Sequence, residues 1–188
     1  DYGVNVEKLV GGYKNFRSWI VSQHLNIDKY KKEWIIIGGL TGSGKTRFLN
    51  LFKESIDLEG IANHRGSAFG GKHDGQPSQA NFENTLTIDY IKHSYDYLIL
   101  EDESRTIGRA GLPGLWYEKM QTSKLIILEV ENDIRAENIY EEYIYKEIKS
   151  GFSEDVLLNK YLGSLKNIKR RLGNKIYSEI KYLMENAF

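Results

Sequence analysis

The chain of 188 residues contains no cysteine and only two prolines, Pro77 and Pro113. Without a thiol, the chain can form no disulfide, no thiolate metal site and no covalent intermediate on sulfur. Any chemistry that needs a sulfur nucleophile must therefore obtain it from elsewhere. The length fits one domain, or one domain with a small helical appendage.

An excess of charge of one sign and long apolar runs are also missing. The 26 basic and 26 acidic residues leave a formal net charge of zero, so a polyanion would need a local basic patch. The longest apolar runs, 34–37 and 125–128, fall far below the roughly 18 residues of a spanning helix, and no secretory signal opens the chain. We expect a soluble, cytoplasmic protein with no membrane partner. Because the chain begins with Asp1 rather than Met, we also expect an upstream segment to be missing.

The order of the periodic segments predicts an α/β domain. The predicted strands lie at 34–37, 56–58, 97–100 and 125–130, and the predicted helices lie at 13–25, at 45–53 and around 82–90. Strands that alternate with helices predict a parallel sheet flanked by helices. After Asn132 the pattern is helical to the end, which predicts a C-terminal helical extension folded as a hairpin.

Residues 39–46 read GLTGSGKT, a complete G-x-x-x-x-G-K-[ST] match between a predicted strand and a predicted helix. Backbone N–H groups of such a loop point at an anion, and Lys45 adds a positive charge. The motif predicts a P-loop NTPase-like fold and a site for two adjacent phosphates with Mg²⁺. It does not indicate that a base or a sugar is recognised. A chance glycine-rich turn is the alternative. The predicted phosphate-binding residues are Gly39, Thr41, Gly42, Ser43, Gly44, Lys45 and Thr46.

The predicted strand 97–100 runs directly into Glu101, Asp102 and Glu103. A phosphate loop needs an acidic residue at the end of a neighbouring strand to hold Mg²⁺. Glu101 has the position and Asp102 the more usual residue type, so both stay candidate metal ligands beside Thr46. Arg105 follows closely and is suited either to stabilising developing charge or to pairing with the glutamates. The predicted catalytic residues are Lys45, Glu101, Asp102 and Arg105, and a solvated acidic loop end is the alternative.

Residues 57–70 read DLEGIANHRGSAFG and precede a polar stretch that reaches Gln79. In a parallel sheet such a segment leaves the carboxyl end of a strand, where ligands bind. His64 and Arg65 suit phosphates, and Phe69 suits stacking on a base or covering an apolar chain. A plain surface loop is the alternative. The predicted substrate-loop residues are Asn63, His64, Arg65, Gly66, Ser67, Phe69, Gln76 and Gln79.

The balanced total charge hides an asymmetry near the C-terminus. Residues 160–188 contain seven basic residues against two acidic ones, and residues 129–155 contain nine acidic residues against three basic ones. Lys166, Lys169 and Arg170 are spaced for one helix face, which suits an RNA backbone, although a merely solvated face is the alternative. The predicted RNA-binding residues are Arg109, Lys166, Lys169, Arg170 and Arg171. We divide the chain into an N-terminal linker and helix (1–31), a P-loop core (32–150) and the helical C-terminal extension (151–188).

Several ordered blocks resemble one family. They are GGYKNFR at 11–17, GLTGSGKT at 39–46, DLEGIANHRGSAFG at 57–70, QPSQANFEN at 76–84 and LEDESRTIG at 100–108. Together they resemble tRNA 2-selenouridine synthase, over the part of the chain from Gly11 to about Tyr143. The helical tail contributes little to the resemblance.

The resemblance implies a chemistry that this chain alone cannot complete. That family joins a rhodanese domain with a catalytic Cys to a P-loop domain, and it replaces sulfur by selenium in the wobble 2-thiouridine of tRNA. Selenophosphate is the donor, and geranyl diphosphate supplies an S-geranyl intermediate. Because this chain has no Cys, selenation would need a Cys-bearing rhodanese partner, whether that half was removed or is a separate chain.

The resemblance also suggests which step the chain performs. A P-loop with Lys45, Thr46 and Mg²⁺ is complementary to the charge that develops on a departing diphosphate. Thiouridine sulfur is already a good nucleophile, so positioning could suffice for its geranylation. Two other interpretations stay open. One is a small-molecule or nucleoside kinase, in which Arg135 would be a lid arginine, and the other is a non-catalytic tRNA-binding module.

Overall fold

The computed structural model describes residues 7–187, so the first six residues of the predicted N-terminal segment and Phe188 lie outside it. The first half contains α1 (Gly12–His24), η1 (Ile27–Tyr30), β1 (Glu33–Gly38), α2 (Lys45–Leu49), α3 (Leu58–Ala62), α4 (Gln79–Lys92) and β2 (Tyr97–Glu101). The second half contains β3 (Thr106–Ile107), β4 (Ala110–Gly111), α5 (Gly114–Thr122), β5 (Lys124–Ile127), α6 (Asn132–Tyr140), η2 (Glu141–Tyr145), α7 (Lys146–Lys149), α8 (Glu154–Asn167), α9 (Lys169–Leu172) and α10 (Asn174–Ala187).

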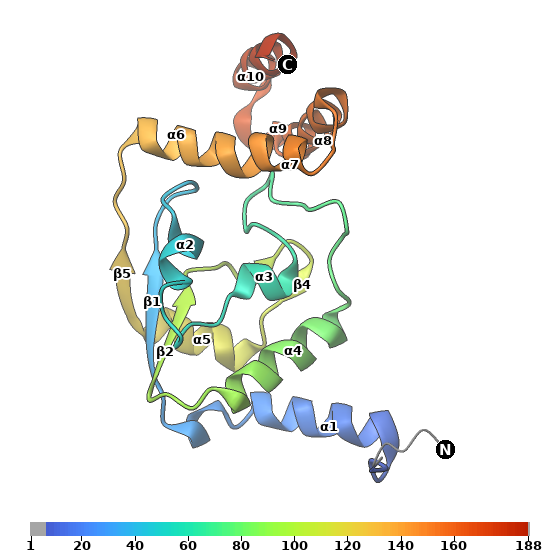
Figure 1. Cartoon of the computed structure of the whole chain (residues 1–188), viewed down its shortest axis with the longest axis vertical. Helices are drawn as coiled ribbons and strands as arrows, with labels where there is room; N and C mark the ends of the chain where they lie inside the picture. Colours follow the sequence, from blue (N-terminus) through green and yellow to red (C-terminus); the bar gives the residue numbers. More distant parts are fainter. Residues whose placement is uncertain (1–6, 188) are drawn as a thin grey trace.

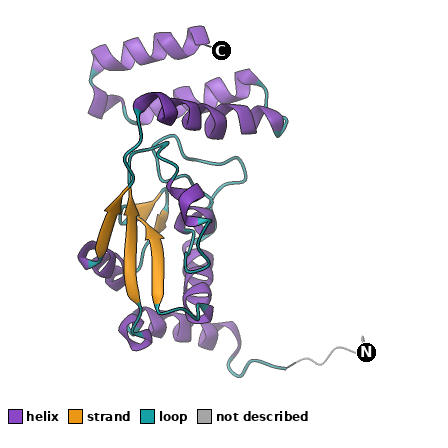
Figure 2. Cartoon of the chain, turned by 60° about the vertical axis from the view of Figure 1, so that its left-hand side comes forward, coloured by secondary structure: helices purple, strands orange, loops and turns teal. Residues whose placement is uncertain are grey.

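A three-stranded parallel sheet in the order β2-β1-β5 lies at the centre, with helices around it (Figure 2). In the central strand β1, Ile35 is in register with Ile99 on one side and with Lys124 on the other. The β-branched run of β1 is buried between the two neighbouring strands, as a near-continuous apolar run in a parallel sheet requires. The predicted α/β class, with a parallel sheet flanked by helices, is confirmed.

The predicted strand at 56–58 is wrong. Only Ser55 forms a parallel bridge, to Ile99, and helix α3 begins at Leu58. The reason is a local cap, because the Asp57 carboxylate accepts a 2.7 Å hydrogen bond from the Gly60 N–H and so satisfies the first turn of a helix. Other predicted boundaries shift as well. Helix α2 ends at Leu49 instead of residue 53, strand β5 ends at Ile127 instead of residue 130, and the β3–β4 hairpin was not predicted.

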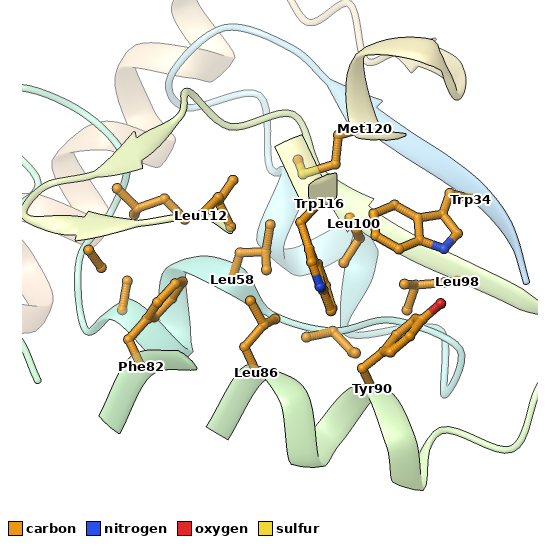
Figure 3. Close-up of a cluster of buried hydrophobic side chains, with 14 of the residues drawn as sticks. Trp34, Leu58, Phe82, Leu86, Tyr90, Leu98, Leu100, Leu112, Trp116 and Met120 are labelled. Atoms are coloured by element: carbon orange, nitrogen blue, oxygen red, sulfur yellow. The ribbon is translucent and has the colours of Figure 1, made fainter. Parts of the chain in front are cut away.

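The larger core lies between the sheet and helices α4 and α5 (Figure 3). Its centre is a group of three aromatic rings, Trp34, Tyr90 and Trp116, with ring centroids 4.9–5.8 Å apart. Such buried aromatic side chains each stabilise the fold by about 2–3 kcal/mol. The Tyr90 hydroxyl donates a 2.8 Å hydrogen bond to the Ile27 carbonyl, so its polar end is satisfied too. This core fixes β1 and β2, and with them the positions of the loops that leave their carboxyl ends.

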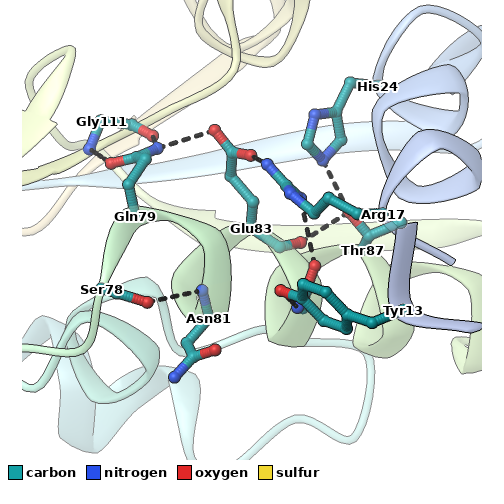
Figure 4. Close-up of polar contacts among 10 residues, drawn as sticks. Tyr13, Arg17, His24, Ser78, Gln79, Asn81, Glu83, Thr87 and Gly111 are labelled. Carbon is teal, nitrogen blue, oxygen red and sulfur yellow. Dashed lines mark hydrogen bonds and ion pairs between the residues drawn. The ribbon is translucent and has the colours of Figure 1, made fainter.

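Helix α1 packs on α4 through polar contacts (Figure 4). Arg17 forms an ion pair with Glu83, and His24 Nε2 lies 2.7 Å from Thr87 Oγ1. The predicted amphipathic helix at 13–25 is therefore present and has a packing role.

The helices after Asn132 form a layer above the carboxyl ends of the strands (Figures 1 and 2). A smaller cluster of buried residues, Tyr143, Leu157 and Tyr161, holds this layer together, and Phe69 from the substrate loop packs against it. The predicted C-terminal helical extension is confirmed. However, a break at Ile168 separates α8 from α9, so Lys166 does not share one continuous helix with Lys169 and Arg170. Between residues 7 and 187, no helix combines the length and the apolar character that crossing a membrane requires.

Candidate functional site

A cleft of about 480 Å³ opens at the carboxyl end of the sheet. Its walls come from the glycine-rich loop 39–46, from residues 57–67 together with Lys72, from residues 102–104 after β2, and from the helix that runs through α6, η2 and α7. Residues far apart in the sequence thus meet in one place. The segment from α6 to α7 supplies one wall, which sequence patterns did not indicate.

The glycine-rich loop is held from outside by α6. Arg135 Nε donates a 3.0 Å hydrogen bond to the Thr41 carbonyl, and Asn138 Nδ2 donates a 2.8 Å hydrogen bond to the Gly42 carbonyl. Gly42 has φ 83°, and a Cβ there would lie 2.5 Å from the Arg135 carbonyl oxygen, so only glycine fits. Lys45 Nζ donates to the Gly39 carbonyl at 2.8 Å and lines the cleft. Arg135 therefore braces the loop and is not among the cleft-lining residues.

Glu101 is completely buried beneath the loop. Its carboxylate accepts hydrogen bonds from Thr46 Oγ1 at 2.9 Å and from the Glu59 N–H at 3.2 Å. Burial, reinforced by the negative charges of Glu59 and Asp57, raises the pKa of Glu101 to about 8. Asp102 instead is exposed and lines the cleft. Glu101 therefore touches the threonine of the glycine-rich loop, while Asp102 faces the open space.

Glu59 is a site residue that sequence analysis missed. A Cβ on Gly66 would lie 2.5 Å from Glu59 Oε1 and 2.6 Å from Glu103 Oε1, so the two carboxylates converge on the same point. Burial raises the pKa of both, and the neighbouring glutamate charges raise them further. Glu59 Oε2 also lies 3.4 Å from Thr46 Oγ1. The available sequence signal was the acidic residue of the DLEG block directly after the predicted strand 56–58, and the structure places this residue in helix α3.

The oxygen donors around Thr46 suit a hard cation such as Mg²⁺. They are the Thr46 hydroxyl and the carboxylates of Glu59 and Glu101, whose raised pKa values reflect negative charges crowded in a buried place. Across residues 7–187, no three His, Asp or Glu side chains are arranged to hold a metal on their own. Mg²⁺ bound by one or two carboxylates usually takes its remaining ligands from water and substrate phosphates, and these residues fit that pattern.

The predicted substrate loop divides into two parts. His64, Arg65, Gly66 and Ser67 line the cleft. Phe69 does not; it packs in the helical layer, with its ring 6.3 Å from that of Tyr161. Asn63 caps α3 and donates to the Gly75 carbonyl at 2.7 Å.

The remaining predicted site residues lie outside the cleft lining. Gln76 and Gln79 bind the backbone of the β3–β4 hairpin. Gln76 donates to the Ile107 carbonyl. Gln79 binds both the N–H and the carbonyl of Gly111 (Figure 4). Arg105 and Arg109 are exposed in that hairpin region. The exposed residues Lys166, Lys169, Arg170 and Arg171 lie on α8 and α9. The structure therefore brings Lys45, Thr46, Glu101 and Asp102 together. The predicted RNA-binding arginines and lysines lie away from these four residues.

Comparison with known proteins decides the family. The family model described as the tRNA 2-selenouridine synthase AAA domain matches residues 32–188. The chain belongs to this family. The tRNA 2-selenouridine synthases of Shewanella sp. strains ANA-3 and MR-7 are each 42% identical over 196 residues, which cover 98% of this chain and 53% of each relative. That of Shewanella oneidensis is 41% identical over 98% of this chain and 52% of its own length.

The chain thus spans about half the length of the tRNA 2-selenouridine synthases that it matches. The resemblance drawn from the sequence blocks is confirmed. No solved structure matches this chain.

Proposed function

We propose that this chain is the P-loop part of a tRNA 2-selenouridine synthase and acts as a transferase. It binds tRNA and geranyl diphosphate, and it geranylates the sulfur of wobble 2-thiouridine on the way to 2-selenouridine. Membership of the family supports the role in tRNA modification. The observation that carries the diphosphate part is the meeting of Lys45 and Thr46 with buried carboxylates in one cleft.

In the proposed reaction the thiouridine sulfur forms a bond to C1 of the geranyl group. The C1–O bond breaks, its electron pair leaves with diphosphate, and the proton on N3 of the base is released. Lys45 would stabilise the charge that develops on the leaving oxygens. Thr46 and Glu101, with Glu59 or Asp102 beside them, would hold Mg²⁺, which when bound neutralises phosphate charge.

The cleft also offers some apolar surface for a prenyl chain. Ile139 and Tyr143 line it, and both belong to the cluster of the helical layer. Because Phe69 packs in that same cluster outside the cleft lining, we assign the first contact with the geranyl group to Ile139 and Tyr143.

The selenium step needs a second component. The chain has no cysteine, so a Cys-bearing rhodanese domain or partner would have to carry selenium from selenophosphate. A single phosphorus fills a two-phosphate loop poorly, which favours geranyl diphosphate as the ligand of this cleft. A cytoplasmic location remains a prediction of the sequence.

Calorimetric titration with geranyl diphosphate tests the proposal. We expect binding that requires Mg²⁺, and we expect Lys45→Ala to weaken it about 10- to 100-fold because a charge-assisted hydrogen bond is lost. Lys53→Ala, which changes an exposed lysine outside the cleft lining, is the matched control. Undiminished binding by Lys45→Ala contradicts the proposal. NTP turnover stimulated by a small hydroxyl acceptor favours the kinase alternative, and salt-dependent tRNA binding without geranylation favours a binding module.

A further inference from the structure

The chain between α3 and α4 forms a small hairpin-like loop, residues 64–72. His64 and Gly71 form an antiparallel bridge, and the Arg65 N–H donates a 3.0 Å hydrogen bond to the Gly70 carbonyl. This pairing places Lys72 next to His64 and Arg65, and all three line the cleft. Burial, and then the charges of Lys72 and Arg65, lower the pKa of His64.

The helical layer holds the far side of this loop in place. Arg65 Nη2 donates to Glu147 Oε1 at 2.5 Å, and Ser67 Oγ lies 2.8 Å from the Tyr143 hydroxyl. The His73 ring stacks on Phe152 at 3.6 Å. Figure 1 shows the chain between α3 and α4 rising to meet α7. Contacts with the helical layer therefore hold the loop in place while its basic side chains line the cleft.

Lys72 differs from its neighbour Arg65 in having no counter-ion. Glu147 offsets the charge of Arg65, whereas no ion pair or hydrogen bond engages the Lys72 ammonium within residues 7–187. A half-buried lysine that faces a cleft without a partner loses solvation and recovers it only when an anion binds. Among the described residues, the cleft thus has Lys45 on the glycine-rich loop and, on the loop 64–72, a second lysine, which has no ion pair or hydrogen bond.

We infer that Lys72, assisted by His64, binds a backbone phosphate of the RNA strand that carries the acceptor nucleoside. This inference rests on the proposed function, in which the glycine-rich loop already holds the diphosphate. Backbone phosphates supply most of the affinity and fix the register of a nucleic acid on a protein. A chain with no net charge must rely on such local contacts. Lys72 lies in the cleft, unlike the predicted RNA residues on α8 and α9, so it would act at the reacting nucleotide.

Fluorescence anisotropy with an anticodon stem-loop bearing 2-thiouridine, over a series of salt concentrations, tests this inference. We expect Lys72→Ala to weaken RNA binding about tenfold at low salt and to reduce the slope of log affinity against log salt by about one. Lys53→Ala is the control and leaves both quantities unchanged. Thermal melting of each variant establishes that it is folded.

Separate titration with geranyl diphosphate distinguishes the failure of this inference from that of the proposed function. Unchanged RNA affinity and slope in Lys72→Ala overturn the inference, even where geranyl diphosphate binds normally. Loss of geranyl diphosphate affinity with intact RNA binding also overturns it, because Lys72 would then belong to the small ligand. Absence of geranyl diphosphate binding by the unsubstituted chain refutes the proposed function and leaves the RNA measurement decisive for Lys72.

Discussion

The ion pair between Glu147 and Arg65 ties the cleft loop to the helical layer, so its removal is expected to loosen the site. Glu147→Gln keeps the size of the side chain and removes its charge. Arg65 at 2.5 Å and Lys160 at 3.9 Å then lose their only carboxylate partner among residues 7–187. Burial already lowers the pKa of Lys160, so its unpaired charge is costly.

The size of the effect follows from the exposure of the partners. Breaking a fully buried ion pair costs about 3–5 kcal/mol, and surface pairs contribute about 0–1 kcal/mol. The side chains of Glu147 and Arg65 are 10% and 17% exposed, which places them near the buried limit but not at it. We therefore expect the free energy of unfolding to fall by about 2 kcal/mol, or the Tm to fall by about 4–8 °C.

Urea unfolding and amide hydrogen exchange together measure this prediction. Glu142→Gln is the matched control, because its partners Arg47 and Lys146 have side chains that are 48% and 50% exposed. We expect the control to cost under about 0.5 kcal/mol. Faster exchange in the 64–73 loop should accompany Glu147→Gln alone. Equal costs for Glu147→Gln and Glu142→Gln, with unchanged exchange in the loop, would show that the Glu147–Arg65 pair does not hold the loop to the helical layer.

Two further predictions concern glycine and histidine positions. Gly42→Ala should destabilise the fold by about 2 kcal/mol or more in urea unfolding, because φ is 83° and the new Cβ would lie 2.5 Å from the backbone carbonyl oxygen of Arg135. Gly75→Ala, at φ 72° with nothing within 4 Å of its Cβ, should cost only about 1 kcal/mol, and equal costs would contradict the clash. Burial lowers the pKa of His24 from 6.5 to about 4, so stability is full above pH 6.5 and falls by up to about 3 kcal/mol as the pH drops toward 4. His24→Gln, which keeps an amide near Thr87, should remove that part of the pH dependence, and an unchanged pH profile would count against it.

Sequence patterns predicted the elements whose signal is local. The β-branched run of β1, the apolar spacing of α4 and the match at 39–46 all depend on neighbours in the chain. The predicted strand at 56–58 failed for the same reason, since its apolar residues alternate briefly but the Asp57 cap starts a helix there. The local sequence is compatible with a strand and with a helix, and the capping hydrogen bond stabilises the helix.

Sequence patterns could not predict which distant segments come together to form the cleft. Glu59 reaches Glu101 across 42 positions of the chain, and Arg65 reaches Glu147 across 82. The first contact depends on how α3 packs on the sheet and the second on how the helical layer packs over it, and periodicity does not encode such packing. Tertiary packing also decides the position of Phe69. Its aromatic ring suggested a ligand contact, but the ring packs in the cluster of the helical layer. Residue type indicated a site, and tertiary packing decided which residues face it.

Geranyl transfer by this cleft is tested by the mass of the nucleoside after the chain is mixed with Mg²⁺, geranyl diphosphate and a 2-thiouridine anticodon stem-loop. We predict a mass increase by one geranyl group that is lost with Lys45→Ala. An unmodified nucleoside, under conditions where both the RNA and geranyl diphosphate bind, would contradict the claim that this cleft performs the transfer.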